Sequence, residues 1–523
     1  RRFIATGTIN FDSPVHIGGE IPSGGMDAPF LHNGQGKYVI PGTSLAGVLR
    51  SWMDDHYRSS TDTVFGPREL NGSDGFASNI FFEDAVICNP AGILRHGVGI
   101  DRYTGSSAPH FKYDHVILGA GTKATFRIVC TLSEGDNQDH DKALLAVLIA
   151  LRDGDISIGA HNTKVHGRIS ANNLCFKKQN FDRDSMLNRI IDPDSGNPVG
   201  LDDASTADCT YFAVTARFTA LSPVMSNQAI DSGLVDSIPR VEISSGDAYL
   251  VLPGSSLKGV LRSECERIVR TVCNLSINLK QDFHFPSQLS LPLINEMFGH
   301  PEIKSGTDDS SNGRRGVLNV SDVRAQICTQ DLWEKILVPI YQKIEKSDNS
   351  DRDRAKQIDK LYEALTKANL DWHIGNHVAI DRWSGEGGGG GALFSVLEPH
   401  GAKWEALQIR LEINRLNDEM RTPAIALLLS ALHGLHTGRV GLGFGTNRGL
   451  GRVRLDSLEF SGKSMIEQFQ LPTSVTFPAQ IDTDPGEPFW TLFPELTVTK
   501  IRTGWKAWIE TERAKNKESE HSH

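Results

Sequence analysis

Hydrophobic and polar positions along the chain predict the same pair of elements twice. Runs at 123–132 and 405–413 have the pattern of strands, and each is followed by an apolar run of helical character, at 142–151 and 423–432. These apolar runs fall far short of the roughly 18 residues that a membrane-spanning helix needs. Short strands mixed with helices favour an α+β fold over a parallel α/β sheet.

The same landmarks recur in the same order in both halves of the chain. Residues 39–51 and 251–263 agree at ten of thirteen positions. The other landmarks are a Phe-Gly pair, a segment with an aspartate after a short strand, an Ile-Asp-Arg-aromatic element and a closing glycine-rich turn, at 64–66, 79–85, 98–105 and 158–168, and again at 297–299, 317–323, 378–385 and 442–452. Ordered recurrence of this kind indicates a tandem duplication.

The duplication sets the predicted domain boundaries. We expect one domain at 1–205, a second at 206–460, and a C-terminal extension at 461–523 that contacts other subunits. The second domain is longer because it carries a charged helical insertion at about 332–370. The order of strands and helices in each copy resembles a ferredoxin-like βαββαβ unit with large insertions.

Net charge excludes some classes of binding partner, and the cysteines indicate the cellular compartment. The 523 residues include 54 Lys and Arg against 64 Asp and Glu, and the net charge of −10 argues against binding nucleic acid or an anionic membrane through bulk charge. The seven cysteines form no Cys-x-x-Cys pair, so we expect reduced thiols in a cytoplasmic protein. Glycine is frequent, at 50 residues, which indicates that particular backbone geometries are needed.

Each Pro-Gly element predicts a helix start that can bind an anion. Gly42 and Gly254 free the backbone, the following Ser or Thr can cap the helix, and its first N–H groups attract a phosphate. The alternative is an ordinary capped helix. The candidate residues here are the serines Ser44 and Ser256 at the helix starts, and the cations that follow them, Arg50 in the first copy and Lys258 and Arg262 in the second.

Two other repeated segments suggest contacts to a ligand. The closing turns place glycines beside cations, although the first turn has fewer glycines than the second, and a packing turn is the alternative. The Ile-Asp-Arg elements pair a cation with an aromatic, which suits stacking on bases, and the alternative is an aromatic that anchors its own loop. The candidates are Arg168, Arg448 and Arg452 in the closing turns, and Arg102, Tyr103, Arg382 and Trp383 in the Ile-Asp-Arg elements.

One aspartate in each copy lies in an irregular loop before the Pro-Gly element. Asp27 and Asp236 precede the proline of that element by 14 and 17 residues. A loop carboxylate can hold a hydrated divalent cation and orient a nucleophile. Most loop aspartates only cap turns, which is the alternative.

Together these residues resemble the repeat-associated mysterious protein (RAMP) superfamily. The shared features are the Gly-x-x-Asp loop, the Pro-Gly-Ser/Thr-Ser-Leu-x-Gly-x-Leu-Arg turn, the Phe-Gly pair and the closing turn that ends in arginine, and they cover roughly residues 3–460. More narrowly, each copy is similar to the backbone subunit of type III CRISPR effector complexes. Two copies in one chain resemble the tandem backbone subunit of type III-D variant complexes.

The resemblance implies a fold, an activity and partners. It implies two ferredoxin-like palms, similar to RNA-recognition motifs, with thumbs drawn from about 101–122 and 381–403. It implies that Asp27 and Asp236 are catalytic and that each supports cleavage of a target RNA with Mg²⁺ or Mn²⁺ at that aspartate. The implied partners are a guide CRISPR RNA lying on the candidate residues above, a complementary target RNA, other RAMP subunits and the large signalling subunit, and no membrane.

Two alternatives remain open. The chain could be a structural guide-binding subunit with silent centres. It could also be a guide-processing endonuclease that uses histidine acid–base chemistry without a metal, with His16 and His32 near Asp27 as candidates, although the second copy has no matching histidine. Packing or surface roles are expected for the other close histidine pairs, which lack a third metal ligand at a suitable spacing: His373 with His377, and His433 with His436.

Overall fold

The computed structural model divides the chain into two compact units, Arg1–Cys209 and Thr210–His523, with a boundary close to residue 205. Helices and strands are mixed in both units, which confirms the α+β class. The described residues are 1–19, 27–67, 76–88, 90, 92–133, 138–160, 166–181, 191–200, 211–230, 234–244, 246–275, 285–300, 313–342, 350–387, 393–478 and 489–521. In these ranges no helix has both the length and the apolarity to cross a membrane.

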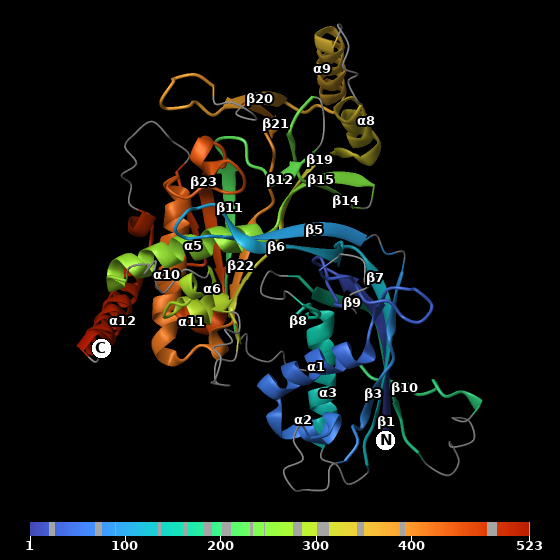
Figure 1. The fold of residues 1–523 in the computed structure, drawn as a ribbon. Coiled ribbons are helices and arrows are strands. Elements are labelled where there is room, and N and C mark those ends of the chain that lie inside the picture. The colour runs from blue at the N-terminus through green and yellow to red at the C-terminus, as the bar shows by residue number, and fades with distance from the viewer. Residues whose placement is uncertain are drawn as a thin grey trace. The chain divides into compact units, whose positions relative to one another are not determined.

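The first unit is built on an antiparallel sheet with β1 (Arg2–Phe11) at its centre. β1 pairs with β7 (Lys123–Thr131) on one side and β9 (Arg168–Gln179) on the other. Apolar residues such as Ile9 and Phe11 recur at every second position of β1 and face one core. The helices sharing that core are α1 (Gly42–His56), α2 (Arg58–Phe65) and α3 (Gln138–Arg152) (Figure 1). Short strands complete the sheet: β2 (Val39–Ile40), β3 (Ile80–Phe82), β4 (Ala85–Cys88), β8 (Ile156–Ser157) and β10 (Asn197–Pro198).

A long hairpin belongs to the first unit but not to its main sheet. β5 (Gly92–Ile100) and β6 (Ser107–Leu118) pair with each other, and Val98 and Ile100 near the tip are exposed. The segment expected to form a thumb, 101–122, includes β6 but not its partner β5, and a thumb role for this hairpin stays a prediction. The glycines and polar residues of β5 interrupt the run of apolar positions, so the sequence pattern did not predict this strand.

The second unit repeats this arrangement around β11 (Phe212–Ala220). β11 lies between β22 (Leu407–Leu411) and β23 (Val453–Ser461), as β1 lies between β7 and β9. The sheet continues to β18 (Leu318–Val320) and β24 (Ser474–Thr476). Helices α5 (Gly254–Cys273) and α10 (Asp418–His436) share its core. Short elements of the same unit are α6 (Phe285–Gln288), α7 (Ile294–Phe298), β16 (Gly299–His300), β17 (Arg314–Arg315), η2 (Ile413–Arg415) and η3 (Thr446–Arg448).

A second, smaller core of this unit contains two helices, which lie in and just before the insertion expected at about 332–370. These are α8 (Gln330–Tyr341) and α9 (Ser350–Lys367), and Trp333 meets Trp372 edge-on with ring centroids 6.0 Å apart. The surrounding strands are β12 (Asn227–Ala229), β13 (Ser237–Pro239), β14 (Val241–Ser244), β15 (Asp247–Leu252), β19 (Val323–Thr329) and the hairpin β20 (Trp372–Val378) with β21 (Leu393–Pro399) (Figure 1). The segment expected to form the second thumb, 381–403, likewise includes β21 but not β20, and a thumb role for this hairpin stays a prediction.

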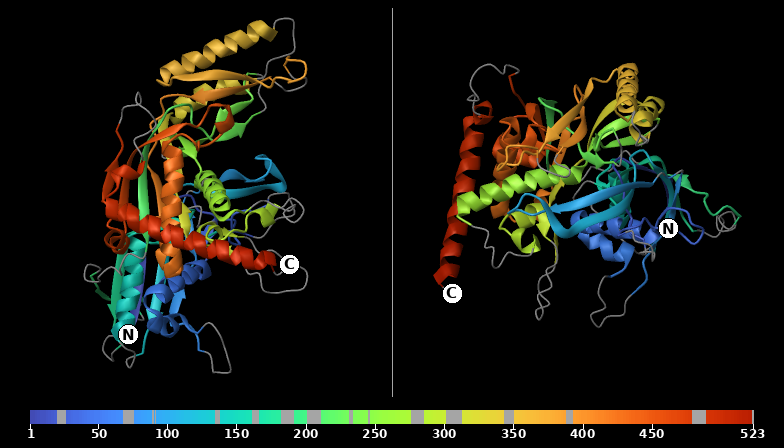
Figure 2. Two further views of the ribbon diagram at one scale, coloured as in Figure 1. Left: turned by 90° about the vertical axis from the view of Figure 1, so that its left-hand side faces the viewer. Right: turned by 45° about the horizontal axis from the view of Figure 1, so that its top comes forward.

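The segment after residue 460 packs into the main core of the second unit. α12 (Glu495–His521) contacts α10 and α5 (Figure 2). Phe489 stacks on Phe477 with ring centroids 5.5 Å apart. This segment, which also contains α11 (Lys463–Phe469) and η4 (Phe489–Leu492), is therefore part of the second unit and not a separate extension. Its contact with other subunits stays a prediction.

Candidate functional site

Asp27 is held against the hairpin of the first unit. Its Oδ2 accepts the backbone N–H of Asp114 in β6 at 2.9 Å. The next residue, Ala28, forms a parallel bridge with His115 and exchanges backbone hydrogen bonds with Asp114 and Val116. The Asp27 side chain is exposed beside this strand. The glycines that precede it, at 24–25, lie outside the described residues.

Asp236 has the same arrangement in the second unit. Its Oδ2 accepts the backbone N–H of Ser395 in β21 at 2.7 Å and the Ser395 hydroxyl at 3.2 Å. The next residue, Ser237, pairs in parallel with Val396. Asp236 is also exposed. The two aspartates therefore occupy equivalent positions, and the three extra residues in the second spacer do not displace Asp236.

The anion predicted at each helix start is a carboxylate of the chain itself. Asp84 accepts the N–H of Gly42 at the start of α1 at 2.8 Å, and Asp322 accepts the N–H of Gly254 at the start of α5 at 2.7 Å. The N-cap positions are prolines, and no serine or threonine side chain caps either helix. The first N–H of each helix is therefore already bonded within the chain, and a phosphate at either helix start stays a prediction that this geometry does not support. Ser44 and Ser256 are half-buried in the first helical turn.

The cations that follow these helix starts make internal contacts. Arg50 donates to Asp62 at 3.0 Å. Lys258 is 7% exposed and its Nζ donates to the carbonyl of Leu318 at 2.7 Å. Arg262 donates to the Leu289 and Gly299 carbonyls and pairs with Glu266 at 2.6 Å. Contact of these side chains with RNA stays a prediction, and their geometry gives it no support.

We expect Asp322→Ala to destabilise the second unit by about 1–2 kcal/mol, as loss of a helix N-cap does. The N–H of Gly254, a buried residue, would lose its acceptor. Asp322→Asn is the matched control because an amide oxygen can still accept this bond. Thermal melting should place Asp322→Asn close to the wild type, and equal losses for both variants would contradict the capping role.

The closing glycine turns have the same hydrogen bonds in both units. The N–H of Ala160 donates to the His16 carbonyl at 2.9 Å, and the N–H of Phe444 donates to the Met225 carbonyl at 2.7 Å. Gly159 and Gly443 both have a φ of +84°, and a Cβ at either would lie within 2.2 Å of that carbonyl oxygen. The smaller number of glycines in the first turn therefore changes neither its path at Gly159 nor its anchoring bond.

The arginines of these turns have two different environments. Arg168 and Arg452 end the turns, are exposed, and donate their backbone N–H groups to Ser13 and Ser222, each at 2.9 Å. Arg448 has its guanidinium 4.6 Å from the ring centroid of Phe394, the residue before the serine that holds Asp236. An exposed cation therefore stacks on the chain neighbour of the residue that holds the second aspartate. Its counterpart in the first turn, residue 164, lies outside the described residues.

The hairpin tips are matched Asp turns that expose an aromatic side chain. Asp101 Oδ1 accepts the N–H groups of Tyr103 and Thr104, and Asp381 Oδ1 accepts those of Trp383 and Ser384. These bonds lower the pKa of Asp381 below its ordinary value, with the Ser384 N–H the larger cause. Tyr103 is 64% exposed and Trp383 is 99% exposed, so neither ring anchors its own loop.

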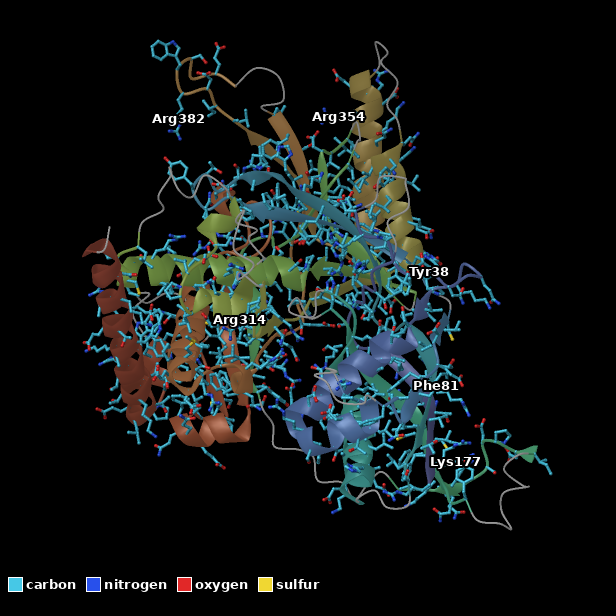
Figure 3. All side chains as sticks on the ribbon, turned by 60° about the horizontal axis from the view of Figure 1, so that its bottom comes forward. Tyr38, Phe81, Lys177, Arg314, Arg354 and Arg382 are labelled. Atoms are coloured by element: carbon cyan, nitrogen blue, oxygen red, sulfur yellow. The ribbon has the colours of Figure 1, made fainter. Side chains whose placement is uncertain are left out.

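The arginines beside these aromatics belong to the same tips. Arg102 Nη1 donates to the carbonyl of Ile100 at 2.6 Å. Arg382 projects from the far end of the β20–β21 hairpin, away from the body of the second unit (Figure 3). Each tip therefore carries one arginine next to one exposed aromatic.

The histidines do not form the metal-free centre considered above. His16 is buried, with its Nδ1 2.6 Å from the Val116 carbonyl, so a substrate cannot reach it. His32 is exposed and packs on Tyr38, with ring centroids 4.2 Å apart. The two other pairs have packing or surface roles: burial lowers the pKa of His433 and of His436, His377 bonds to Glu398, and exposed His373 pairs with Asp371.

Each aspartate can bind a metal ion only if a substrate supplies further ligands. Among the described residues no group of three or more His, Cys, Asp or Glu could hold a metal ion. Each aspartate leaves Oδ1 without a hydrogen-bond donor from the described residues. Mg²⁺ is commonly bound by one or two carboxylates plus substrate phosphates, so one exposed carboxylate oxygen suits a cation that arrives with RNA.

Sequence reasoning missed the residues that position these features. Asp84 and Asp322 stand at equivalent places in the repeated segments 79–85 and 317–323, and that repetition is the signal that could have identified them as caps. Asp114 and Ser395 lie in no landmark shared by the two copies, so the sequence contained no such signal for them.

A model of the RAMP superfamily matches residues 8–170 and 217–454, one stretch in each compact unit. No curated protein matches the chain at a significant level. The two matched stretches carry the equivalent aspartates, hairpins and closing turns, and they cover well over half of the chain. The chain therefore belongs to the RAMP superfamily.

Proposed function

We propose that the chain is a guide-RNA-binding backbone subunit of a type III CRISPR effector complex, of the tandem type III-D variant kind, and that it cleaves target RNA at two centres. RAMP proteins are CRISPR-associated proteins that bind RNA. The observation that carries the proposal is one geometry present twice: Asp27 and Asp236 are each held by the second strand of a hairpin whose tip exposes an aromatic residue. An aspartate that only capped a turn would not need to be held by the second strand of such a hairpin in both units.

The strand order supports a ferredoxin-like palm in each unit. In a βαββαβ unit of this kind, the fourth, first, third and second strands are neighbours. The corresponding orders here are β9-β1-β7-β3 and β23-β11-β22-β18. On this interpretation β5–β6 and β20–β21 are the thumbs, and RNA binding is local and does not depend on a basic surface.

The exposed tips and turns supply the proposed RNA contacts. Tyr103 and Trp383 would stack on bases, and Arg102 and Arg382 would pair with phosphates. Arg448, stacked on Phe394 near Asp236, would position a phosphate at the second centre. Arg168 and Arg452 are exposed at the ends of the closing turns and would contact the guide backbone.

We propose Mg²⁺ or Mn²⁺ as the cofactor, held by Asp27 or Asp236 together with RNA phosphates. When bound, a divalent cation stabilises the negative charge that builds up on a phosphate as it reacts. The carboxylates are already oriented by the backbone N–H groups of Asp114 and Ser395. The other proposed partners are further RAMP subunits and the large signalling subunit, and the exposed Val338 of α8 suits a protein contact.

The test uses the full chain assembled with its guide. Purified protein should carry a short RNA, detected as nucleic-acid absorbance, and the complex should cut labelled complementary RNA in Mg²⁺ but not in EDTA. Binding of guide and target without cleavage would make the chain a structural guide-binding subunit. Cleavage that persists in EDTA would rule out the proposed chemistry, and failure to bind RNA would contradict the whole proposal.

We expect Trp383→Ala to weaken target binding by about 5–160-fold, because stacking contributes roughly 1–3 kcal/mol per base. The indole is 99% exposed, so its removal should leave the melting temperature unchanged. Trp383→Phe keeps an aromatic face and is the matched control. Filter binding of labelled target should separate the variants, and equal affinity for Trp383→Ala and wild type would exclude stacking by this tip.

A further inference from the structure

The two aspartate centres differ at the residue that holds the carboxylate. In the second unit this residue is Ser395, which is buried and whose hydroxyl also bonds to Asp236. In the first unit the equivalent residue is Asp114, which gives only its backbone N–H to Asp27. The side chain of Asp114 is therefore available for a different contact.

That contact is a histidine on the other strand of the hairpin. His96 faces Asp114 in the β5–β6 register, and its Nδ1 lies 2.5 Å from Asp114 Oδ1. The equivalent pair in the second unit is Asn376 with Ser395, which cannot transfer a proton in this way. The side chains of His96 and Asp114 are 49% and 37% exposed, so the pair lies at the surface where a substrate could reach it.

Asp114 connects the histidine to the aspartate. Its backbone N–H bonds to Asp27 at one edge of β6, and its carboxylate bonds to His96 at the other. A carboxylate on one ring nitrogen fixes the orientation of an imidazole and leaves the other nitrogen for proton transfer. His96 and Asp27 are thus each one hydrogen bond away from the same residue.

We propose that His96, oriented by Asp114, is the proton donor of the first centre, and that the equivalent pair of the second centre, Asn376 with Ser395, supplies no such donor. The inference rests on the proposed cleavage of RNA at Asp27. His96 would then be a catalytic residue that contacts the scissile phosphodiester, and Asp114 a positioning residue.

The proton transfer balances without a further reactant. The 2′-oxygen of the RNA forms a bond to phosphorus while the bond between phosphorus and O5′ breaks. The 2′-hydroxyl gives its proton to water, and the protonated imidazole of His96 gives a proton to O5′. His96 then regains a proton from the water, and no electrons are exchanged.

The experiment places the second unit's residues into the first. His96→Asn and Asp114→Ser copy a pair that the hairpin of the second unit already accommodates. In the guide-loaded complex His96→Asn should slow the cut assigned to Asp27 about 100-fold or more, as expected for loss of a general acid. The cut assigned to Asp236 is an internal control in the same molecule and should keep its rate.

Two further measurements separate catalysis from structure. Added imidazole should restore the slowed cut in His96→Ala, which a merely structural role would not allow. Asp114→Ser should lower the rate of the Asp27 cut without changing target affinity. An unchanged rate in His96→Asn, or a slowed cut in His96→Ala that imidazole does not restore, would overturn the inference, while loss of that cut in Asp27→Ala would still support the proposed function. Both cuts persisting in Asp27→Ala would refute the proposed function itself.

Discussion

Asp27→Ala should abolish one of the two cuts in target RNA and leave the other intact, and Asp236→Ala should have the reciprocal effect. Each carboxylate accepts a backbone N–H from the second strand of its hairpin and lies exposed beside that strand. Loss of metal-assisted charge stabilisation should lower the rate at that centre by at least about 100-fold. Gel analysis of end-labelled target would show one product band lost in each variant.

A matched control separates this effect from general loss of surface charge. Asp418 is an exposed aspartate whose side chain makes an ion pair with Arg421 within one helix, an interaction worth less than about 1 kcal/mol. Asp418→Ala should leave both cuts at wild-type rates. Loss of both cuts in either single centre variant would indicate that the centres are coupled, contrary to two independent sites.

Gly443→Ala should be the most destabilising of the glycine substitutions in the second closing turn. A side chain at a φ of +84° costs roughly 1–2 kcal/mol. The new Cβ would also lie 2.2 Å from the Met225 carbonyl oxygen, which is the acceptor of the Phe444 N–H. Relieving this overlap adds about 1–3 kcal/mol. The melting temperature should therefore fall by roughly 5 °C or more.

Gly449→Ala is the control for backbone strain without overlap. Gly449 has a φ of +89°, but a Cβ added there would have no described atom within 4 Å. Its substitution should cost only the conformational term of about 1–2 kcal/mol. Thermal melting of both variants gives the difference, and equal melting temperatures would show that the approach to Met225 is not a real constraint.

The internal repeat allowed much of the architecture to be predicted. Identity at ten of thirteen positions between 39–51 and 251–263 indicated that α1 and α5 start in the same way. The repeated Ile-Asp-Arg-aromatic element marked both hairpin tips, because its aspartate bonds to N–H groups two and three residues later. Such contacts are local in sequence, so a sequence pattern records them.

Contacts between distant residues were not predictable from the same pattern. The helix start at Gly254 uses a carboxylate 68 residues away, and Asp236 is held by a strand 159 residues away. These partners depend on strand register and on which strands become neighbours, and neither is encoded by spacing. The carboxylates at the two helix starts were not predicted for this reason, because a capping residue from elsewhere in the chain cannot be identified from the helix sequence alone.

Mapping the ends of target RNA cut by the guide-loaded wild-type complex directly tests whether the chain holds two guide-directed cleavage centres. Two centres in one duplicated chain predict two cuts with a fixed spacing, both within the segment paired to the guide. Both cut positions should move together when the complementary segment is moved along the target. Cuts whose positions do not follow the complementary segment, or no cleavage in Mg²⁺ of a target that is demonstrably bound, would contradict the account.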